Sequence, residues 1–448
     1  MKKIYLSLFA AATISHTASA QTCVRYATDV YTTYSVTSNV VYGASKAFGA
    51  SSVSNLTLDF YQPTGDTSVA RPLIIWAHGG SFVGGTKTDA DVVALSQRFA
   101  KKGFACASIN YRTGFYPFDS TGIVPALLRA VQDMKASIRF FHKDKLTSNT
   151  YKIDTNNIFI GGSSAGAITA LHVAYLDKTC EINPYINQTT LASLGGIDGY
   201  SGNQCYSSKI NGVVNLCGAL GKYWWIEANG MPFCSMHGTA DGTVYYGQAK
   251  ANPGFPTLYL DGSRMLYAGT QSLGVNHKFY TFYGAPHVPY AGSSATQMAY
   301  MDTTVNFVRD YLIGRMACTN TPLQMPNTPL SAANTTTATG NMTVYSYTGC
   351  TTNTPTPCSA VGINELSANN LLQSIYPNPS SDKVTLVFVN ANIEHTVTLM
   401  DVTGKIVKTE KTTSSEFTFE KSAIQSGIYF LKITENTGQS SVHKIIFN

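Results

Sequence analysis

One short stretch has the residue types and spacing of a serine nucleophile on a tight turn. Residues 158–174 read IFIGGSSAGAITALHVA, an apolar run, then glycines and serines, then a helix-like run of small and apolar residues. Gly162, Ser164 and Gly166 fit the pattern G-x-S-x-G, in which small residues two positions either side of the serine permit a sharp strand-to-helix turn. The same pattern can arise by chance in a Gly- and Ser-rich chain, but the flanking runs favour the turn. We therefore predict that Ser164, rather than Ser163, is the nucleophile.

A serine hydroxyl is a weak nucleophile at neutral pH and needs a neighbouring base. After Ser164, Asp241 follows the apolar run PFCSMHG, and His287 follows HKFYTFYGAP. The order Ser, acid, His recurs where all three follow strands at one edge of a parallel sheet, so these three are the candidate catalytic residues. The alternatives to a catalytic role are that Asp241 is an ordinary turn aspartate and that His287 is an ordinary surface-loop histidine. His237 precedes the acid and His277 begins a strand, so neither suits the role of base.

The negative charge that develops during acyl transfer needs backbone N–H groups aimed at it. Ala165 follows the predicted nucleophile and supplies one N–H. The loop HGGSFVGG, residues 78–85, follows another apolar run, and we assign the other two donors to Gly80 and Ser81. His78 in this loop is interpreted as a structural anchor rather than a catalyst.

The surrounding pattern predicts an α/β domain. Residues 36–62 indicate two antiparallel strands, and short apolar runs at 71–77, 104–110, 157–161, 210–217, 232–238 and 277–283 indicate strands buried on both faces of a sheet. Segments 88–102, 124–143, 165–176 and 298–315 have helical character. Strands that alternate with helices predict a mostly parallel, doubly wound sheet.

The two ends of the chain differ from this domain. Residues 1–20 have two lysines, a short apolar run and a closing ASA, which is typical of a secretory signal peptide and too short to span a membrane. Residues 21–317 form the predicted catalytic domain. A Thr-, Asn- and Pro-rich linker with an unclear part covers 318–370, and short alternating runs at 371–448 predict a small β-sandwich.

Composition and cysteines fit a protein outside the cytosol. Of 448 residues only 12% are charged, and the net charge is +6. The basic residues are scattered and form no cluster that would indicate nucleic-acid binding. Nine cysteines suit an oxidising compartment. Cys106, inside an apolar run, is the expected buried free thiol, whereas Cys180 with Cys205, and Cys350 with Cys358, are pairs suggested by proximity. No cysteine spacing resembles a zinc site.

These motifs carry a family resemblance. HGG, GGSSAG, HGTAD and GAPH, in this order, resemble the α/β-hydrolase superfamily, and within it the secreted carboxylesterases with an HGGG-type oxyanion loop. Ser81 replaces the third glycine of that loop. The resemblance implies an α/β-hydrolase fold over about residues 36–315 and an ester hydrolase that needs no cofactor and no metal. SIYPNPSSDKVTL and the terminal KIIFN resemble the type A sorting domain of type IX secretion, with a carbohydrate-binding sandwich as the alternative.

We therefore expect a secreted, monomeric serine ester hydrolase that forms an acyl-enzyme, with an ester substrate and the secretion machinery as its partners. Aromatic loops on the catalytic edge favour aromatic or polymer-linked esters, such as feruloyl or acetyl esters of polysaccharide or an aromatic polyester. The alternatives are a serine peptidase of related fold and a non-catalytic binding protein. Residues 177–209 could form a lid. The candidate substrate-binding residues, which could instead pack as core, are Tyr111, Phe115, Tyr116, Trp224, Trp225 and Tyr245.

Overall fold

The computed structural model describes residues 24–250, 258–271, 273–316, 371–401, 404–436 and 439–448. The chain divides into two compact units, Met1–Thr356 and Pro357–Asn448. The expected signal peptide at 1–20 and the expected linker at 318–370 lie outside the described residues. Within the described ranges, no helix combines the length and the apolar character that crossing a membrane requires.

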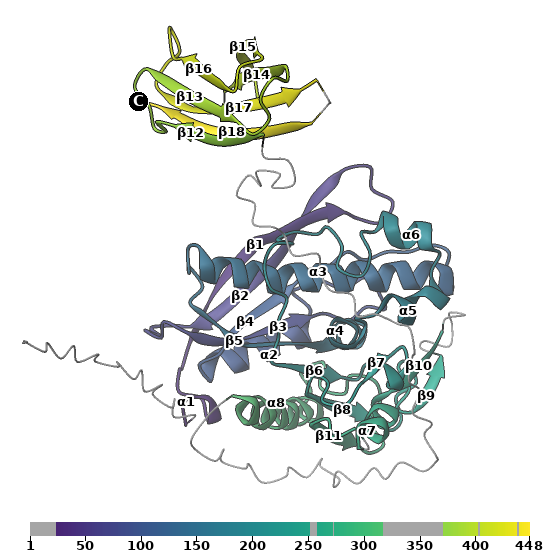
Figure 1. The fold of residues 1–448 in the computed structure, drawn as a ribbon. Coiled ribbons are helices and arrows are strands. Elements are labelled where there is room, and N and C mark those ends of the chain that lie inside the picture. Colours follow the sequence, from purple (N-terminus) through teal and green to yellow (C-terminus); the bar gives the residue numbers. More distant parts are fainter. Residues whose placement is uncertain (1–23, 251–257, 272, 317–370, 402–403, 437–438) are drawn as a thin grey trace, which may run out of the picture. The chain divides into compact units, whose positions relative to one another are not determined.

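A central eight-stranded sheet organises the first unit, in the order β1-β2-β4-β3-β5-β6-β8-β11 (Figure 1). The first two strands pair antiparallel, as predicted, and β2 pairs antiparallel with β4. All other neighbours are parallel, which confirms the mostly parallel sheet. The strands are β1 (Tyr34–Lys46), β2 (Val53–Pro63), β3 (Arg71–Ala77), β4 (Ala105–Ile109), β5 (Ile153–Ser163), β6 (Gly212–Leu216), β8 (Phe233–Gly238) and β11 (His277–Phe282).

Helices cover both faces of this sheet. One buried cluster contains residues of α1 (Val24–Ala27), α2 (Ala90–Lys101) and α8 (Ala295–Arg315), and the other contains residues of α3 (Ser120–Leu146) and α4 (Ala165–Tyr175). Strand β3 serves both clusters, because Ile74 and Trp76 belong to the first and Leu73 and Ile75 to the second. Burial on both faces explains why this strand reads as a continuous apolar run.

Several short elements between the main strands escaped prediction. They are α5 (Thr179–Ile182), η1 (Asn183–Tyr185), α6 (Gln188–Ser193), β7 (Ala219–Leu220), η2 (Tyr223–Trp225), β9 (Gln248–Lys250), β10 (Tyr259–Gly262) and α7 (Ser263–Gln271). Strands β7, β10 and β9 form a small antiparallel sheet. Elements of two to nine residues contain too few repeats of an apolar period to stand out in a sequence.

The second unit consists of two antiparallel sheets, β12-β13-β16 and β15-β14-β17-β18, around one core. Alternation places Val384, Leu386 and Phe388 of one strand in that core, as the predicted β-sandwich requires. The strands are β12 (Leu372–Tyr376), β13 (Lys383–Phe388), β14 (His395–Met400), β15 (Ile406–Thr412), β16 (Glu416–Glu420), β17 (Gly427–Glu435) and β18 (Ser440–Phe447).

The described cysteines are of two kinds. Cys106 is a buried free thiol, as predicted, and Cys217 and Cys234 are buried free thiols as well. Cys180 and Cys205 are both disulfide-bonded, and their pairing with each other stays a prediction. The remaining cysteines, 23, 318, 350 and 358, lie outside the described residues, and so does the suggested pair formed by the last two.

Candidate active site

Ser164 lies on a tight turn between β5, which ends at Ser163, and α4, which begins at Ala165. Its φ of 56° and ψ of −120° are sparsely populated values that persist only where the surroundings impose them. A Cβ on Gly162 would lie 2.3 Å from the Ala77 carbonyl oxygen, and one on Gly166 would lie 2.0 Å from the same atom. Small residues are therefore required either side of Ser164 because the turn presses against the end of β3.

The three candidate catalytic side chains, which follow β5, β8 and β11, are hydrogen-bonded in series. Ser164 Oγ lies 2.8 Å from His287 Nε2, and His287 Nδ1 lies 2.7 Å from Asp241 Oδ2. The Asp241 side chain is fully buried, whereas 20% of the His287 side chain is exposed. A carboxylate only accepts hydrogen bonds, so Nδ1 carries the imidazole proton. The other nitrogen, Nε2, is left free to accept the proton of the Ser164 hydroxyl.

Asp241 is held by four hydrogen bonds. Its Oδ1 accepts the backbone N–H groups of Thr243 and Val244, both at 2.9 Å, and its Oδ2 accepts from His287 and from His237 Nε2 at 3.1 Å. Burial by itself would raise the pKa of this carboxyl. The hydrogen bonds from the two histidines outweigh burial and hold the pKa of Asp241 well below its usual range. The carboxyl group is therefore ionised at neutral pH.

Backbone hydrogen bonds join the loops that carry the acid and the histidine. Thr239 N–H donates to the Phe282 carbonyl, and Ala240 N–H donates to the Ala285 carbonyl, both at 3.0 Å. Gly284 N–H donates to the Thr239 hydroxyl at 2.8 Å. The two loops therefore form one unit, which fixes the separation of Asp241 from His287.

The loop 78–85 passes beside Ser164. A Cβ on Gly79 would lie 3.3 Å from Ser164 Cβ and 4.0 Å from Ser164 Oγ. Ser81 and Phe82 both have positive φ, 53° and 62°, which L-residues adopt only under constraint. The N–H groups of Gly80, Ser81 and Ala165 donate no hydrogen bond to any described residue. These three predicted oxyanion donors are thus available to a ligand.

His78 and Tyr111 support this loop. The Tyr111 hydroxyl donates to the His78 carbonyl at 2.9 Å, and the two rings stack with centroids 4.2 Å apart. His78 is 1% exposed, and burial lowers its pKa. Phe82 is tied on the other side, because its carbonyl accepts the Gly114 N–H at 2.7 Å. These contacts fit the anchoring role expected of His78.

The six aromatic candidates do not share one environment. Tyr111, Phe115 and Trp225 are at most 5% exposed and belong to the core beneath the loops, so they offer almost no surface to a ligand. For these three the core alternative describes the structure, because the loops fold back over them. Tyr116 and Tyr245 are exposed, at 73% and 39%, and Trp224 is half-buried.

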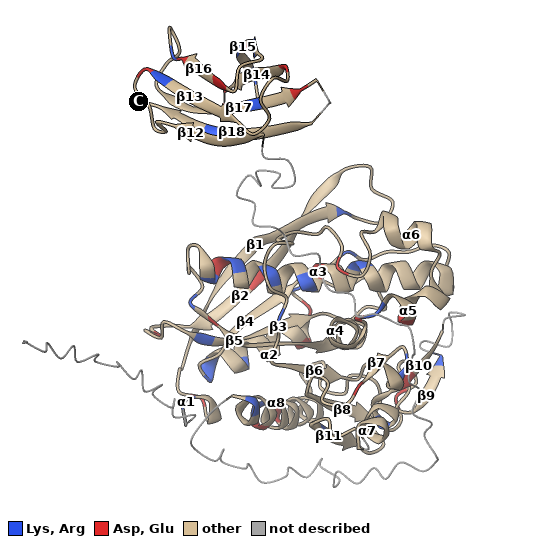
Figure 2. Ribbon diagram, viewed as in Figure 1, with Lys and Arg blue, Asp and Glu red and all other residues tan. Residues whose placement is uncertain are grey.

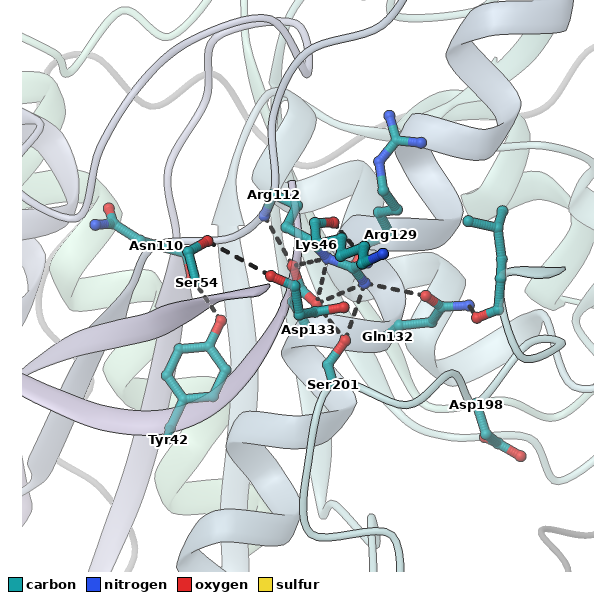
Figure 3. Close-up of polar contacts among 12 residues, drawn as sticks. Tyr42, Lys46, Ser54, Asn110, Arg112, Arg129, Gln132, Asp133, Asp198 and Ser201 are labelled. Atoms are coloured by element: carbon teal, nitrogen blue, oxygen red, sulfur yellow. Dashed lines mark hydrogen bonds and ion pairs between the residues drawn. The ribbon is translucent and has the colours of Figure 1, made fainter. Parts of the chain in front are cut away.

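The insertion 177–209 is fastened to α3, which carries charged residues of both signs along its length (Figure 2). Arg112 pairs with Asp133 in the core, and Ser201 Oγ donates to Asp133 at 2.5 Å while accepting from Arg112 at 2.9 Å (Figure 3). Gln132 Nε2 donates to the Leu194 carbonyl at 2.9 Å, and Lys135 pairs with Asp198. Residues 194–203 are therefore a packed part of the domain rather than a free lid.

Two neighbours of the site were not identified from the sequence. His237 Nε2 contacts the Asp241 carboxylate. The motif HGTAD, in which the histidine comes four residues before the aspartate, is the signal from which this contact could have been predicted. Cys217 follows the end of β6, and its sulfur lies close to Asp241 and His287. The Cys217 sulfur, an Asp241 carboxylate oxygen and a His287 ring nitrogen all lie within 4.8 Å of one another. No spacing in the sequence indicated this cluster.

Two family models match the chain. Residues 58–220 match the BD-FAE family, a range that includes Ser164 and the loop 78–85 but ends before Asp241 and His287. Residues 374–448 match the secretion system C-terminal sorting domain.

Curated relatives align only with part of their own length. The quorum-quenching protein AidA of Acinetobacter baumannii (strain MDR-ZJ06) is 36% identical over 121 residues, 26% of this chain and 35% of that protein. Carboxylesterase 3B of Mus musculus is 34% identical over 116 residues, 25% of this chain and 19% of that protein. Among solved structures, the apo form of Thermogutta terrifontis esterase 2 has a TM-score of 0.46 and 19% identity, and the superposition covers 63% of this chain and 96% of the other.

Proposed function

Because this chain joins an α/β-hydrolase domain to a C-terminal secretion sorting domain, we propose that it is a secreted serine carboxylic-ester hydrolase. The observation that carries the proposal is the hydrogen-bonded series from Ser164 through His287 to Asp241, at 2.8 and 2.7 Å. Nucleophile, base and orienting carboxylate stand in the order that acyl transfer requires. The free N–H groups beside Ser164 provide the matching anion site.

The reaction follows from this geometry. Ser164 Oγ attacks the ester carbonyl carbon while His287 Nε2 takes the hydroxyl proton. Asp241 stabilises the imidazolium, and the N–H groups of Gly80, Ser81 and Ala165 bind the oxyanion. When the tetrahedral intermediate collapses, His287 returns the proton to the leaving alcohol. Water, activated by the same imidazole, then releases the acid from the acyl-enzyme.

The substrate class is proposed from the loops at the catalytic edge. Tyr116, Trp224 and Tyr245 follow the carboxyl ends of β4, β6 and β8 and keep exposed ring surface. Aromatic surface beside an acyl-transfer site favours aromatic or polymer-linked esters, such as feruloyl or acetyl esters of polysaccharide or an aromatic polyester. Secretion through the sorting domain would bring the enzyme to such extracellular polymers.

A substrate panel tests the reaction class. Short p-nitrophenyl esters, a feruloyl ester, acetylated xylan and an aromatic polyester are compared with peptide amides at matched enzyme concentration. We expect turnover of esters and none of amides. Amide cleavage without ester preference would favour a peptidase, and a folded protein that turns over nothing would favour a binding protein.

The paired serines supply the matched control. Ser164→Ala should lower turnover by roughly four to six orders of magnitude, as removal of a catalytic-triad member does. Ser163 is 1% exposed, and its hydroxyl accepts from Tyr290 at 2.8 Å instead of facing His287. Ser163→Ala should therefore keep most of the activity, and a serine-directed phosphonate should label the wild type and Ser163→Ala but not Ser164→Ala. An active Ser164→Ala enzyme would overturn the assignment.

A further inference from the structure

A free thiol that the proposed reaction does not use lies inside the candidate active site. Cys217 directly follows β6, is fully buried and has a φ of 55°. Its sulfur, a carboxylate oxygen of Asp241 and a ring nitrogen of His287 all lie within 4.8 Å of one another. Nothing in acyl transfer requires a thiol at this place, so the position calls for a separate account.

The three groups match the ligand preferences of one class of ion. Zinc takes thiolate sulfur, imidazole nitrogen and carboxylate oxygen, and softer divalent ions such as cadmium favour the thiolate still more. Metal–ligand bonds of about 2.0–2.3 Å place ligand atoms about 3.5 Å apart, so binding requires side-chain shifts of only about 1 Å. Of the three ligands, His287 is partly exposed, at 20% of its side chain, whereas Cys217 and Asp241 are buried.

The surroundings of the sulfur also accommodate a thiolate once a cation is present. Cys217 is fully buried, and the neighbouring Asp241 carboxylate disfavours a second negative charge on the sulfur. The backbone N–H groups of Val288 and Gly238 hydrogen-bond to the sulfur and act in the opposite direction. A divalent cation between sulfur and carboxylate reverses the unfavourable charge, which is how metals deprotonate coordinating thiols.

We propose that Cys217, Asp241 and His287 form a binding site for a thiophilic divalent cation, and that the bound ion switches the active site off. The inhibitory part rests on the proposed ester hydrolysis, whereas the ion site itself does not. The ion is a soft or borderline cation such as Zn²⁺ or Cd²⁺, and it binds between Asp241 and His287 Nδ1, where the hydrogen bond that orients His287 now lies.

The inhibition follows from where the protons go. On binding, the thiol proton of Cys217 leaves to solvent, and the cation takes the lone pair of His287 Nδ1 in place of the Nδ1 proton. That proton relocates to Nε2, so the neutral imidazole becomes the other tautomer. Nε2–H cannot accept the hydroxyl proton of Ser164, and the nucleophile loses its base. Removal of the cation restores the original tautomer, so the inhibition is reversible.

Binding is tested on the full chain with cadmium alone. Cd²⁺ is titrated against wild type and Cys217→Ala, and the ultraviolet sulfur-to-cadmium charge-transfer absorbance is followed. We expect a difference of one bound ion and one cadmium–thiolate band between the two proteins. Cys234→Ala and Cys106→Ala remove the other two buried free thiols of the described residues and serve as matched controls that keep the band. A wild type with no band dependent on Cys217 overturns the proposal.

A second variant keeps the test decisive if Cys217→Ala does not fold. His287→Ala retains the thiol, and loss of one ligand should weaken cadmium binding at least about tenfold. Unchanged affinity in folded His287→Ala overturns the site. Ester turnover should fall as Cd²⁺ or Zn²⁺ saturates the wild type and return with EDTA. A protein that shows the band but hydrolyses no ester retains the ion site and refutes the proposed function. Turnover that persists at cadmium saturation refutes the switch.

Discussion

His237 and His287 contact the same carboxylate oxygen of Asp241, at 3.1 and 2.7 Å. His237 Nε2 also lies 2.8 Å from the Val244 carbonyl, and both neighbours are acceptors, so Nε2 carries the proton. The other nitrogen, Nδ1, then accepts the Ser263 hydroxyl at 2.8 Å. His237 is fully buried and fixed at both nitrogens, and it therefore helps to fix the position of the Asp241 carboxylate that contacts His287.

Substitution of His237 should lower the turnover number without removing the chemistry. In His237→Ala the carboxylate loses one of its four hydrogen bonds, and displacement of a catalytic group by about 1 Å can cost up to about 100-fold in rate. We expect kcat to fall within that limit while KM changes little. His237→Gln, which can again donate to Asp241, should recover part of the loss. Steady-state kinetics with a p-nitrophenyl ester give both parameters.

His277→Ala is the matched control for this substitution. His277 is also buried and hydrogen-bonds to Ser235 and Thr270, but it does not touch Asp241. The His277→Ala variant should lose about as much stability as His237→Ala, but its kcat should equal that of the wild type. Equal losses of kcat in the two alanine variants would assign His237 a structural role only.

Asp241→Asn should nearly abolish turnover in a folded protein. The amide oxygen can still accept from Thr243 and Val244, so the loop remains in place. The NH₂ group then faces the N–H donors of His237 and His287, and His287 is driven to the tautomer that cannot accept a proton from Ser164. We expect kcat to fall by up to about four orders of magnitude. Thermal melting checks the fold, and a kcat within a factor of about ten of wild type would exclude the carboxylate from catalysis.

Ser201→Ala should loosen the insertion 177–209. The hydroxyl bridges Arg112 and Asp133 in the interior, and loss of a buried partner costs about 1–3 kcal/mol. Limited proteolysis should cut the insertion faster in this variant than in wild type. Ser207→Ala, an exposed position in the same insertion, is the control and should leave cleavage unchanged. Equal rates in all three proteins would mean that the network does not hold this segment.

Deletion of 371–448 should leave the first compact unit, Met1–Thr356, folded; this unit carries the candidate active site and is called the catalytic unit below. The deleted strands have their own core, and the first unit is compact without them. All three tryptophans lie between residues 76 and 225, so tryptophan fluorescence reports on the catalytic unit alone. We expect unchanged unfolding and ester turnover of the purified protein, with export lost in the native host. A truncated protein that unfolds or is inactive would place the tail within the catalytic unit.

The sequence predicted well whatever has a period or a fixed order. Continuous apolar runs such as 71–77 marked the parallel strands, because a strand buried on both faces has no polar alternation. The three candidate catalytic residues could be ranked because each follows a strand, and parallel strands deliver their carboxyl ends to one edge. Gly162 and Gly166 likewise indicated a tightly packed turn at Ser164, and in the structure that turn presses against Ala77.

Contacts between distant loops could not be predicted in the same way. Cys217 lies beside Asp241 because β6 and β8 are adjacent in the sheet, a relationship that no local pattern encodes. For the aromatic loops the sequence left two interpretations open, substrate contact or core packing, for a related reason. Tyr111 and Phe115 read like surface aromatics in a polar loop, but that loop folds back and buries them. Burial of this kind is decided by tertiary packing rather than by composition.

Glu181 should make the stability of the catalytic unit fall as pH rises. This carboxyl is 2% exposed, and burial, with the charge of Asp177, raises its pKa from 4.5 to about 7. Between these two values the folded state holds a proton that the unfolded state has released, so the free energy of unfolding decreases with increasing pH. The loss is complete above about pH 7 and amounts to at most about 3 kcal/mol. Below about pH 4.5 both states are protonated and the effect vanishes.

Glu181→Gln removes this ionisation while its amide oxygen still accepts the N–H groups of Asp177 and Lys178. Urea unfolding followed by tryptophan fluorescence at about pH 5 and pH 8 should show a gain in the variant that is larger at the higher pH, since only the wild type must bury a charge there. Glu227→Gln is the control, because that carboxylate is exposed and pairs with Lys178 at the surface, where an ion pair contributes little. If the free energies of unfolding of wild type and Glu181→Gln change with pH in parallel, ionisation of the buried Glu181 carboxyl does not destabilise the fold, and the prediction is wrong.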